Sequence, residues 1–312
     1  MSRPTVAVYT PVLNEAKQIE RWAESAKDAD LLLMVDTGSD DSTVEVAKAC
    51  GIEISRAWIE PFRFDDARNV AMYSIPRHID ICLQLDADEV LLEGWREELD
   101  EVNPEHNRWS YWLTNNQNSW GRVRRMNCVR MGKGFRWEHP IHEVIKGDQP
   151  NAHLDTLVME HQPDKSKSRR YVLGMLEYWS AEYPDDARSL FYLGREYTYR
   201  SDWKRARIAL WQYLNHRNAT WGPERGEALM HIAKMDDNPE RWLWQAISEA
   251  PERREPFVHL AKLRIKANEW DRANALLLEA AARTNQGVYT THMDCWGDPF
   301  EKLIARVGRH LK

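Results

Sequence analysis

The chain has few cysteines, and no two of them stand at the spacing of a metal or redox motif. Its 312 residues include four cysteines, which lie far apart at Cys50, Cys82, Cys128 and Cys295. Small secreted proteins that depend on disulfides use many more. A disulfide framework and a short-spaced zinc or redox motif are therefore not expected. We expect buried, reduced thiols in a cytoplasmic protein.

Long apolar runs and a strong excess of one charge are also lacking. No apolar stretch approaches the roughly 20 residues of a membrane helix. No signal-peptide pattern precedes the strand-like run that starts at Val6. The net charge of −6 offers no general attraction for nucleic acid or anionic membranes. A hydrophobic content of 43% is that of a globular protein, and 312 residues accommodate two domains comfortably.

Strand-like and helix-like segments alternate over the first hundred residues. Short apolar runs predict strands, and apolar residues at helical spacing predict helices between them. The strands are expected at residues 6–9, 31–35, 52–54 and 79–85, and the helices at 14–27, 42–50 and 66–74. Ser42 and Glu45 form a capping-box pattern at the start of the second helix. This alternation predicts an α/β fold with a parallel sheet and right-handed crossovers.

Polar residues follow three of the predicted strands at the point where each strand ends. They are Asn14-Glu15 after the first strand, Asp36-Thr37-Gly38-Ser39 after the second, and Asp86-Ala87-Asp88-Glu89 after the fourth. In parallel sheets, ligands bind beyond the carboxyl ends of the strands. The sequence therefore predicts one ligand site that is shared by three strand ends.

The strongest chemical signal is the pair of carboxylates at Asp86 and Asp88. One carboxylate at such a strand end can accept hydrogen bonds from a ribose, and the other can hold a divalent cation that bridges a diphosphate. Carboxylate oxygens suit Mg²⁺ or Mn²⁺. An isolated acidic triplet is usually a solvated turn. Here it follows a buried apolar run and has two other polar strand ends beside it, which favours a site.

The second half of the chain is predicted to be helical and repetitive. Leu193-Gly194, followed by Trp203, resembles Leu260-Ala261, followed by Trp270, at an offset of 67 residues. That offset is close to twice the ~34 residues of a tetratricopeptide repeat. A middle copy is expected over residues 229–246. We therefore predict two domains, an α/β domain at 1–163 and an all-α, tetratricopeptide-like domain at 164–312.

Four motifs of the first domain together resemble the family 2 glycosyltransferases of GT-A fold. They are Pro11-Val12-Leu13-Asn14-Glu15, the run Asp36–Thr43, Ala67-Arg68-Asn69 and Leu85-Asp86-Ala87-Asp88-Glu89. The resemblance covers about residues 4–161. The helical tail resembles the extension in one branch of that family, whose members include bacterial and phage enzymes that glycosylate peptides and relatives that act on surface polysaccharides.

The resemblance implies a donor site for a nucleotide-sugar and a divalent cation, Mn²⁺ or Mg²⁺. The residues it assigns to the nucleotide are Thr10, Asn14, Glu15, Asp36, Arg68 and Asp86. Asp88 is expected to hold the metal, with Asp86 and His161 as further ligands. The resemblance favours a UDP-sugar, although Thr37 stands where many members carry a second acid that often reads uracil.

His142-Glu143 resembles the His-Glu pair that follows the donor motifs in this branch. An inverting transfer needs a base that deprotonates the acceptor as it attacks the anomeric carbon. Glu143 is the first candidate for that base and Glu138 the second. His142 is expected to orient Glu143 or to contact the diphosphate, and Asp88 acts through the cation. The expected activity is transfer of a hexose or pentose to an acceptor hydroxyl or thiol.

The acceptor and two other function classes stay open in the sequence. Repeat helices suit a peptide or protein acceptor, and 15 tryptophans suit a glycan. The basic stretch from Arg122 to Arg136, with Trp120 beside it, is either a solvated strand pair or a surface for an anionic ligand, including the DNA that a phage-type enzyme would modify. A second basic run spans 165–170. The repeats can also form a homodimer, or belong to an adaptor whose catalytic domain is inactive. A nucleotidyltransferase is disfavoured, because no Gly-rich basic loop follows the first strand.

Overall fold

The computed structural model describes residues 3–115, 123–147, 151–164, 171–286 and 289–311. The chain divides into two compact units, residues 1–169 and 170–312, and each is described by itself. Within these ranges, every helix is too short or too polar to cross a membrane. Trp120, Arg122 and the basic run at 165–170 lie outside the described residues.

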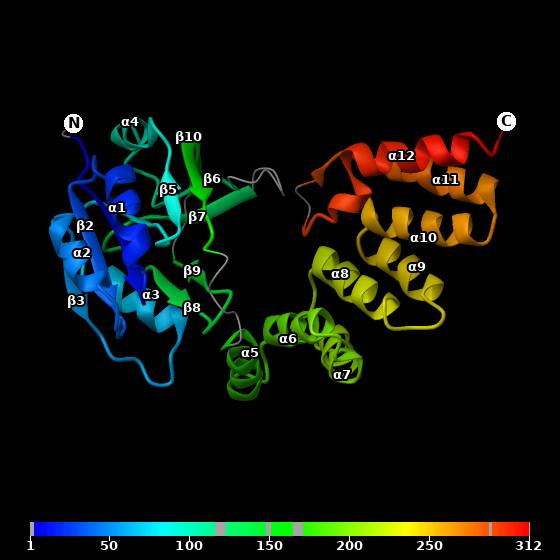
Figure 1. Ribbon diagram of the computed structural model, residues 1–312, viewed down its shortest axis with the longest axis horizontal. Helices are drawn as coiled ribbons and strands as arrows, with labels where there is room; N and C mark the ends of the chain where they lie inside the picture. The colour runs from blue at the N-terminus through cyan, green and yellow to red at the C-terminus, as the bar shows by residue number, and fades with distance from the viewer. Residues whose placement is uncertain (1–2, 116–122, 148–150, 165–170, 287–288, 312) are drawn as a thin grey trace. The chain divides into compact units, whose positions relative to one another are not determined.

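The first unit is built on a mixed, mostly parallel sheet with the strand order β3-β2-β1-β4-β7-β6-β10-β5 (Figure 1). The strands of this sheet are β1 Val6–Val12, β2 Leu31–Asp36, β3 Glu53–Arg56, β4 Ile81–Gln84, β5 Glu89–Leu91, β6 Arg108–Asn115, β7 Val123–Arg130 and β10 Asn151–His161. A small second sheet pairs β8 Arg136–Glu138 with β9 Val144–Lys146. The helices are α1 Ala16–Ser25, α2 Thr43–Ala49, α3 Phe64–Tyr73 and α4 Trp95–Asp100.

The parallel and antiparallel pairings place the carboxyl ends of several strands at one edge of this sheet. β1, β2, β3 and β4 run parallel to one another, and β7 is antiparallel to β4. β6 is antiparallel to β7, β10 is parallel to β6, and β5 is antiparallel to β10. The carboxyl ends of β1, β2, β4, β6 and β10 therefore lie at the same edge as the amino ends of β7 and β5. The predicted α/β fold is confirmed.

Helix α1 fixes the acidic loop at that edge, because its apolar side chains pack on the sheet. The α1 helix buries Ile19, Trp22 and Ala23. The indole N–H of Trp22 also donates a 2.9 Å hydrogen bond to the carbonyl of Leu85, directly before the acidic cluster. Burial of a tryptophan contributes a large apolar area, and its N–H needs a partner when it is buried. Trp22 therefore couples the core to the backbone position of Asp86.

The prediction of a capping box at the start of α2 is wrong. Ser42 is the N-cap residue, but its side chain makes no capping hydrogen bond. Instead, the carboxylate of Asp41 accepts hydrogen bonds from the backbone N–H and the hydroxyl of Thr43. The carboxylate at the helix start also interacts favourably with the helix dipole. The sequence pattern missed this because Asp41 lies one position earlier than a cap normally does.

The second unit is a series of helix pairs in chain order (Figure 1). The pairs are α6 Ala187–Tyr199 with α7 Trp203–Leu214, α8 Gly222–Ala233 with α9 Glu240–Glu249, and α10 Glu255–Lys266 with α11 Trp270–Ala281. Helix α5 Tyr171–Glu182 precedes them, and a short 3-10 helix, η2 Met293–Cys295, and α12 Gly297–Gly308 follow. The first helices of the pairs start 35 and 33 residues apart, at residues 187, 222 and 255. The predicted helical repeat region is confirmed.

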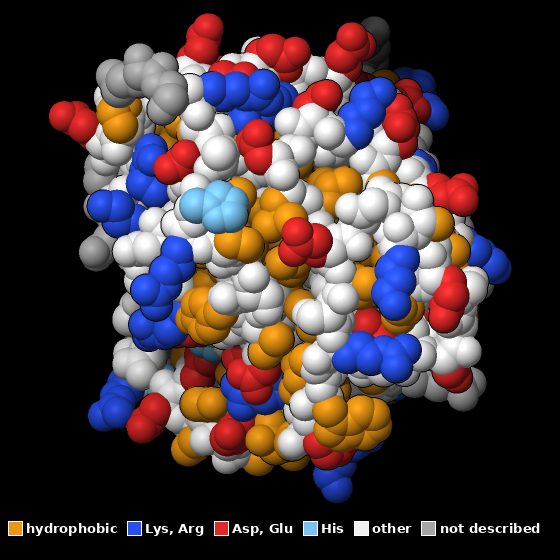
Figure 2. Space-filling model, turned by 90° about the vertical axis from the view of Figure 1, so that its left-hand side faces the viewer, with side chains coloured by type: hydrophobic (Ala, Val, Ile, Leu, Met, Phe, Trp, Pro, Cys, Tyr) orange, Lys and Arg blue, Asp and Glu red, His pale blue; other side chains and the backbone are white. Residues whose placement is uncertain are grey.

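Charged side chains of both signs are interspersed among the described residues on the face of the molecule in Figure 2. This mixture agrees with the small net charge of the chain. A surface of this kind provides no broad field of one sign that would attract a polyanion.

Close approach of α6 and α7 depends on Gly194, which gives a first prediction. A Cβ at position 194 would lie 2.6 Å from Cγ of Leu210, whose side chain is fully buried. At Gly174 in α5, a Cβ would meet nothing within 4 Å. Both sites are helical, so alanine raises helix propensity equally at each. We expect Gly194→Ala to be less stable than Gly174→Ala by about 1–3 kcal/mol in denaturant unfolding, because of overpacking. Equal stabilities would contradict this packing.

Candidate functional site

The turn after β4 is held in one conformation by hydrogen bonds at both of its ends. The backbone N–H of Asp86 donates to Oε2 of Glu89 (3.0 Å), and the N–H of Glu89 donates to the carbonyl of Asp86 (2.9 Å). The carbonyl of Asp88 accepts from the N–H of Gln162 (2.7 Å), just past the end of β10. The carboxylates of Asp86 and Asp88 are therefore presented at the sheet edge on a braced backbone.

Arg68 on α3 links two of the predicted site residues. Its Nη2 lies 2.8 Å from Oδ1 of Asp86, and its Nε donates to Oε1 of Glu143 at 2.7 Å. The guanidinium lies over the ring of Trp137, 4.9 Å from its centroid, and only 8% of the side chain is exposed. Asp86 and Glu143, 57 positions apart in sequence, are thus joined through one planar cation.

The pKa of Asp86 is below its ordinary value. Burial opposes this shift, but the charges of Arg68 and Arg125 outweigh it, and a hydrogen bond from Gln84 adds to their effect. The amide of Gln84 donates to Oδ1 of Asp86 at 2.8 Å. The carboxylate of Asp86 is therefore ionised and already well supplied with donors.

Arg125 belongs to the site, although the sequence assigned it no role there, and it pairs with Glu89 of the acidic turn. Nη1 of Arg125 lies 2.5 Å from Oε1 of Glu89 and 3.7 Å from Oδ2 of Asp86. The pairing of Leu83 with Cys128 in the antiparallel β4–β7 ladder, continued past the end of β4, sets Arg125 opposite Asp86. The contact between Arg125 and Asp86 follows from this strand register, and the spacing of the two residues in the sequence does not predict it. In the sequence, Arg125 is one member of the basic stretch.

The other described members of that basic stretch do not form a single patch. The guanidinium of Arg124 lies over Trp112 and that of Arg130 over Trp109, each 5.4 Å from the ring centroid. Arg136 pairs with Glu138 at 2.5 Å. These side chains have partners within the two sheets. The stretch is not one strand pair, because it forms β7 and β8, which belong to different sheets.

Asp88 and His161 form a second, partly exposed pair in the site. Nε2 of His161 lies 3.2 Å from Oδ2 of Asp88, and their side chains are 32% and 33% exposed. A hydrogen bond with Asp88 raises the pKa of His161, while burial opposes the rise. Within the described residues, Asp86 is not brought into one three-ligand group with these two side chains. A carboxylate oxygen and an imidazole nitrogen at this spacing are suitable ligands for Mn²⁺.

The loops after β1 and β2 interlock beside this edge. The N–H of Asn14 donates to Oγ of Ser39 (2.9 Å), and Oδ1 of Asn14 accepts from the N–H of Asp40 (3.0 Å). Asp36 is fully buried and accepts from the N–H of Ser39 at 3.0 Å, with Arg56 3.1 Å from its other oxygen. These contacts keep the two loops together as one wall.

Two other residues of the predicted nucleotide pocket are held differently. The hydroxyl of Thr10 is buried in β1 and donates to the carbonyl of Pro11 at 3.1 Å. The backbone N–H of Glu15 donates to Oγ1 of Thr43 at 2.8 Å. Trp58, which the sequence did not single out, is 82% exposed, and a Cβ on Gly38 would lie 3.7 Å from its ring. An exposed indole beside the Asp36 loop offers a flat stacking surface.

The candidate bases lie on and beside the small sheet. Glu143 directly precedes β9, and 13% of its side chain is exposed. His142 has a positive φ of 55° and is half-buried. Glu138 at the end of β8 is bonded by Arg136 and lies 3.7 Å from Nζ of Lys146. Of these side chains, Glu143 is the one that Arg68 connects to Asp86.

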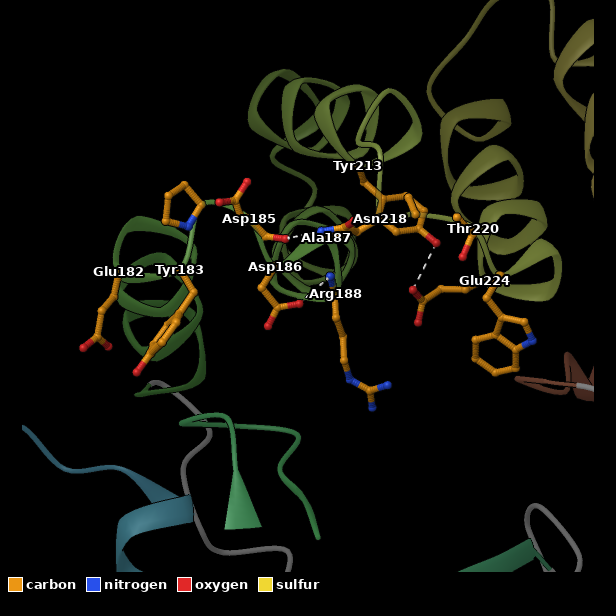
Figure 3. Close-up of a pocket in the computed structure, with 13 residues that line it drawn as sticks. Glu182, Tyr183, Asp185, Asp186, Ala187, Arg188, Tyr213, Asn218, Thr220 and Glu224 are labelled. Carbon is orange, nitrogen blue, oxygen red and sulfur yellow. Dashed lines mark hydrogen bonds between the residues drawn. The ribbon is translucent and has the colours of Figure 1, made fainter. Parts of the chain in front are cut away.

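A cavity of about 650 Å³ lies in the helical unit (Figure 3). Its lining includes Asp186, Arg188, Tyr213, Trp221 and Glu224. The hydroxyl of Tyr213 donates to Oε1 of Glu224 at 3.0 Å, and the carboxylate of Asp186 accepts from the N–H of Arg188. The cavity thus combines aromatic surface with charges of both signs.

Comparisons with known proteins give partial likenesses. No family model matches the chain. A TPR repeat-containing protein of Synechococcus elongatus is 30% identical over 259 residues, which are 74% of this chain and 61% of that protein. The chain therefore spans about 61% of the length of that relative.

Among solved structures, the glucosyl-3-phosphoglycerate synthase of Mycobacterium tuberculosis has a TM-score of 0.30 and 22% identity, over 35% of this chain and 44% of that one. TarS of Staphylococcus aureus has a TM-score of 0.39 and 12% identity, over 79% of this chain and 53% of that one. PilF of Pseudomonas aeruginosa has a TM-score of 0.33 and 16% identity, over 45% of this chain and 65% of that one.

Burial of Glu89 gives a second prediction. Burial raises the pKa of Glu89 from 4.5 to about 7, with Arg125 opposing the shift and Asp86 adding to it. Because the folded state binds this proton more tightly than the unfolded state, Glu89 favours folding below about pH 4.5 and progressively less up to about pH 7. In the parent, the free energy of unfolding should fall between about pH 4.5 and pH 7. In Glu89→Gln this fall should be smaller, by about 1–3 kcal/mol.

The measurement is urea unfolding at several pH values. Glu105→Gln, at an exposed loop position, is the matched control and should keep the parent pH profile. An unchanged profile in Glu89→Gln would show that the carboxyl is not perturbed as described.

Proposed function

We propose that the protein is a metal-dependent glycosyltransferase of family 2 and GT-A type that uses a nucleotide-sugar donor. The observation that carries this proposal is the braced turn at Asp86–Asp88, placed at the carboxyl edge of the sheet. Beside it lie an accessible His161, a buried Arg68 and a candidate base, Glu143. The motifs that resemble family 2 enzymes supply these same residues, so sequence and geometry support the same site.

Asp88 and His161 are the residues that would hold the divalent cation. Both side chains are part-exposed, while Asp86 is occupied by Arg68 and Gln84. Mg²⁺ and Mn²⁺ are often held by few protein ligands together with phosphate oxygens, which fits two ligands here. The cation would offset the charge that develops on the departing nucleoside diphosphate. The donor is proposed to be a UDP-sugar.

The nucleoside is assigned to the wall formed by the loops after β1 and β2. Asp36 and Asn14 lie in that wall, and the exposed indole of Trp58 beside it provides a stacking surface for the base. The ionised Asp86 is assigned to the ribose hydroxyls, since a carboxylate accepts hydrogen bonds from them. Asp86 would accept hydrogen bonds from these hydroxyls and from Arg68 at the same time, and Arg68 would keep the Asp86 carboxylate in its orientation.

Glu143 is assigned as the base of an inverting displacement. The acceptor oxygen attacks the anomeric carbon, the bond from that carbon to the diphosphate oxygen breaks, and the acceptor proton passes to Glu143. Arg68 holds Oε1 of Glu143 at 2.7 Å, so Oε2 is the atom assigned to take the proton. His142, its neighbour, is assigned to the diphosphate side. A positioned base of this kind contributes about 10²–10⁴-fold to a rate.

A peptide, protein or glycan is the proposed acceptor class. Helix pairs of this type present extended binding surfaces, and the cavity near Arg188 and Trp221 offers both aromatic and charged groups. The described arginines of the 122–136 stretch are engaged within the two sheets, so they give no support to DNA as the acceptor. A homodimer through the helical repeats is a further proposal.

A thermal-shift screen of nucleoside diphosphates with Mn²⁺ tests the donor assignment. With ligand at about 100 times Kd, one nucleotide should raise Tm by about 5–10 °C, because it binds only the folded state. Asp88→Asn should lose the Mn²⁺-dependent part of that rise. Asp237→Asn, an exposed position of the helical unit, should behave like the parent. No shift with any nucleotide would refute the proposed function.

Substitution of Glu143 tests the base. Glu143→Gln keeps the hydrogen-bonding shape but cannot take the proton, so hydrolysis of the donor should slow about 10²–10⁴-fold while the nucleotide-induced Tm shift persists. The measurement is release of nucleoside diphosphate from the nucleotide-sugar. Glu138→Gln is the matched control and should cost little. If Glu138→Gln shows the large loss instead, the assignment of Glu143 is wrong.

A further inference from the structure

A second cluster of ligand-type side chains lies in the helical unit. His259 on α10 and Asp294 and Cys295 of η2 place one ligand atom each within 4.8 Å of one another. A nitrogen, a carboxylate oxygen and a sulfur together are the ligand types of zinc sites. Sequence spacing does not predict this cluster, because 35 residues separate His259 from Asp294.

His292 extends the cluster by a second imidazole. Nε2 of His259 lies 3.1 Å from Nδ1 of His292, and Nε2 of His292 lies 2.9 Å from Oε1 of Glu227. Two nitrogens bound to one tetrahedral zinc ion stand about 3.3 Å apart, given Zn–N bonds of about 2.0–2.1 Å. The two imidazoles are therefore already near the spacing that a shared ion requires.

Glu227 sets the orientation of His292. Glu227 is buried, and Nη2 of Arg253 lies 2.8 Å from its Oε2. An ionised Glu227 accepts the Nε2–H of His292. In neutral His292 this leaves the lone pair on Nδ1, directed toward His259. A carboxylate that fixes a metal-binding histidine in this way is a common arrangement at metal sites.

The other ligand-type side chains lie close by. His259 is half-buried on α10, and Cys295 is fully buried in η2. A bound cation would stabilise the thiolate of Cys295. Oδ2 of Asp294 pairs with Lys262 at 2.5 Å, while Oδ1 lies 3.7 Å from the Cys295 sulfur.

We propose that His259, Asp294 and Cys295, with His292 beside them, form a structural site for a zinc-type divalent cation. The ion fastens the segment after α11 to α10. Other contacts already place that segment against the helix pairs: Tyr289 donates to Glu224 at 3.1 Å, and Arg253 donates to the carbonyl of Thr290 at 2.9 Å. Zinc binding replaces the His259–His292 hydrogen bond and releases the thiol proton to solvent.

Cobalt(II) added to the metal-stripped full-length protein tests the proposal. A thiolate bound to cobalt gives a charge-transfer absorption in the near ultraviolet, which oxygen and nitrogen ligands do not give. We expect this band to saturate at one ion per chain in the parent. It should vanish in Cys295→Ser and persist in Cys50→Ser. It should also persist in Asp88→Ala, which removes the metal ligand of the proposed donor site.

A melting curve with and without one equivalent of Zn²⁺ gives a second readout. The parent should gain stability from the ion and lose the gain with a chelator, because the ion binds the folded state. If Cys295→Ser fails to fold, Asp294→Asn is used in its place, because the Asp294 side chain is exposed. Asp294→Asn should weaken the affinity for cobalt at least tenfold. Absence of the band in the parent, its loss in Cys50→Ser, or an unchanged affinity in Asp294→Asn overturns the proposal.

Discussion

Arg68 is the residue on which the geometry of the proposed donor site depends. Its guanidinium is nearly buried over Trp137 and contacts Asp86 on one side and Glu143 on the other. A buried cation without such partners would cost several kcal/mol, and each of these two carboxylates would be costly without the cation. The three groups therefore require one another. In the proposed mechanism they connect the ribose end of the donor to the base that activates the acceptor.

The second arginine of the site brings the charge of this network close to neutral. Arg125 comes from the antiparallel strand β7 and is shared between Glu89 and Asp86. With two arginines for three acids, the interior of the site is close to neutral only if one carboxyl keeps its proton. The raised pKa of Glu89 agrees with this, since Glu89 is the least exposed of the three acids. Burial at Glu89 thus leaves Asp86 ionised for its assigned role.

The sequence predicts the first four strands and three helices of the sheet well, because hydrophobic periodicity is a local property, but it gives no bounds for α4, β5, β8, β9 or β10. The strands at residues 6, 31 and 81 and the acidic turn after β4 all follow from short windows of sequence. The partners of these residues depend on nonlocal geometry. Arg125 contacts Asp86 because of the register of β7. Arg68 contacts Glu143 because the loop before β9 approaches α3. The spacing of these residues in the sequence predicts neither contact. The cap at Ser42 was also not predicted correctly, since the carboxylate of Asp41 accepts from the first N–H of α2 and the hydroxyl of Ser42 makes no capping hydrogen bond.

The two proposed metal sites differ in the chemistry that selects an ion. Asp88 and His161 are each about one-third exposed and offer one oxygen and one nitrogen, which leaves open positions for phosphate oxygens of a substrate. His259, Asp294 and Cys295, with His292 beside them, offer nitrogen, oxygen and sulfur. The Cys295 thiol is fully buried, the Asp294 carboxylate is exposed, and Glu227 orients His292. Affinity alone would favour zinc over manganese at either site. Ligand softness therefore distinguishes them: a set that contains a buried thiolate retains a structural ion, while a hard, open pair lets a donor bring its diphosphate to the metal.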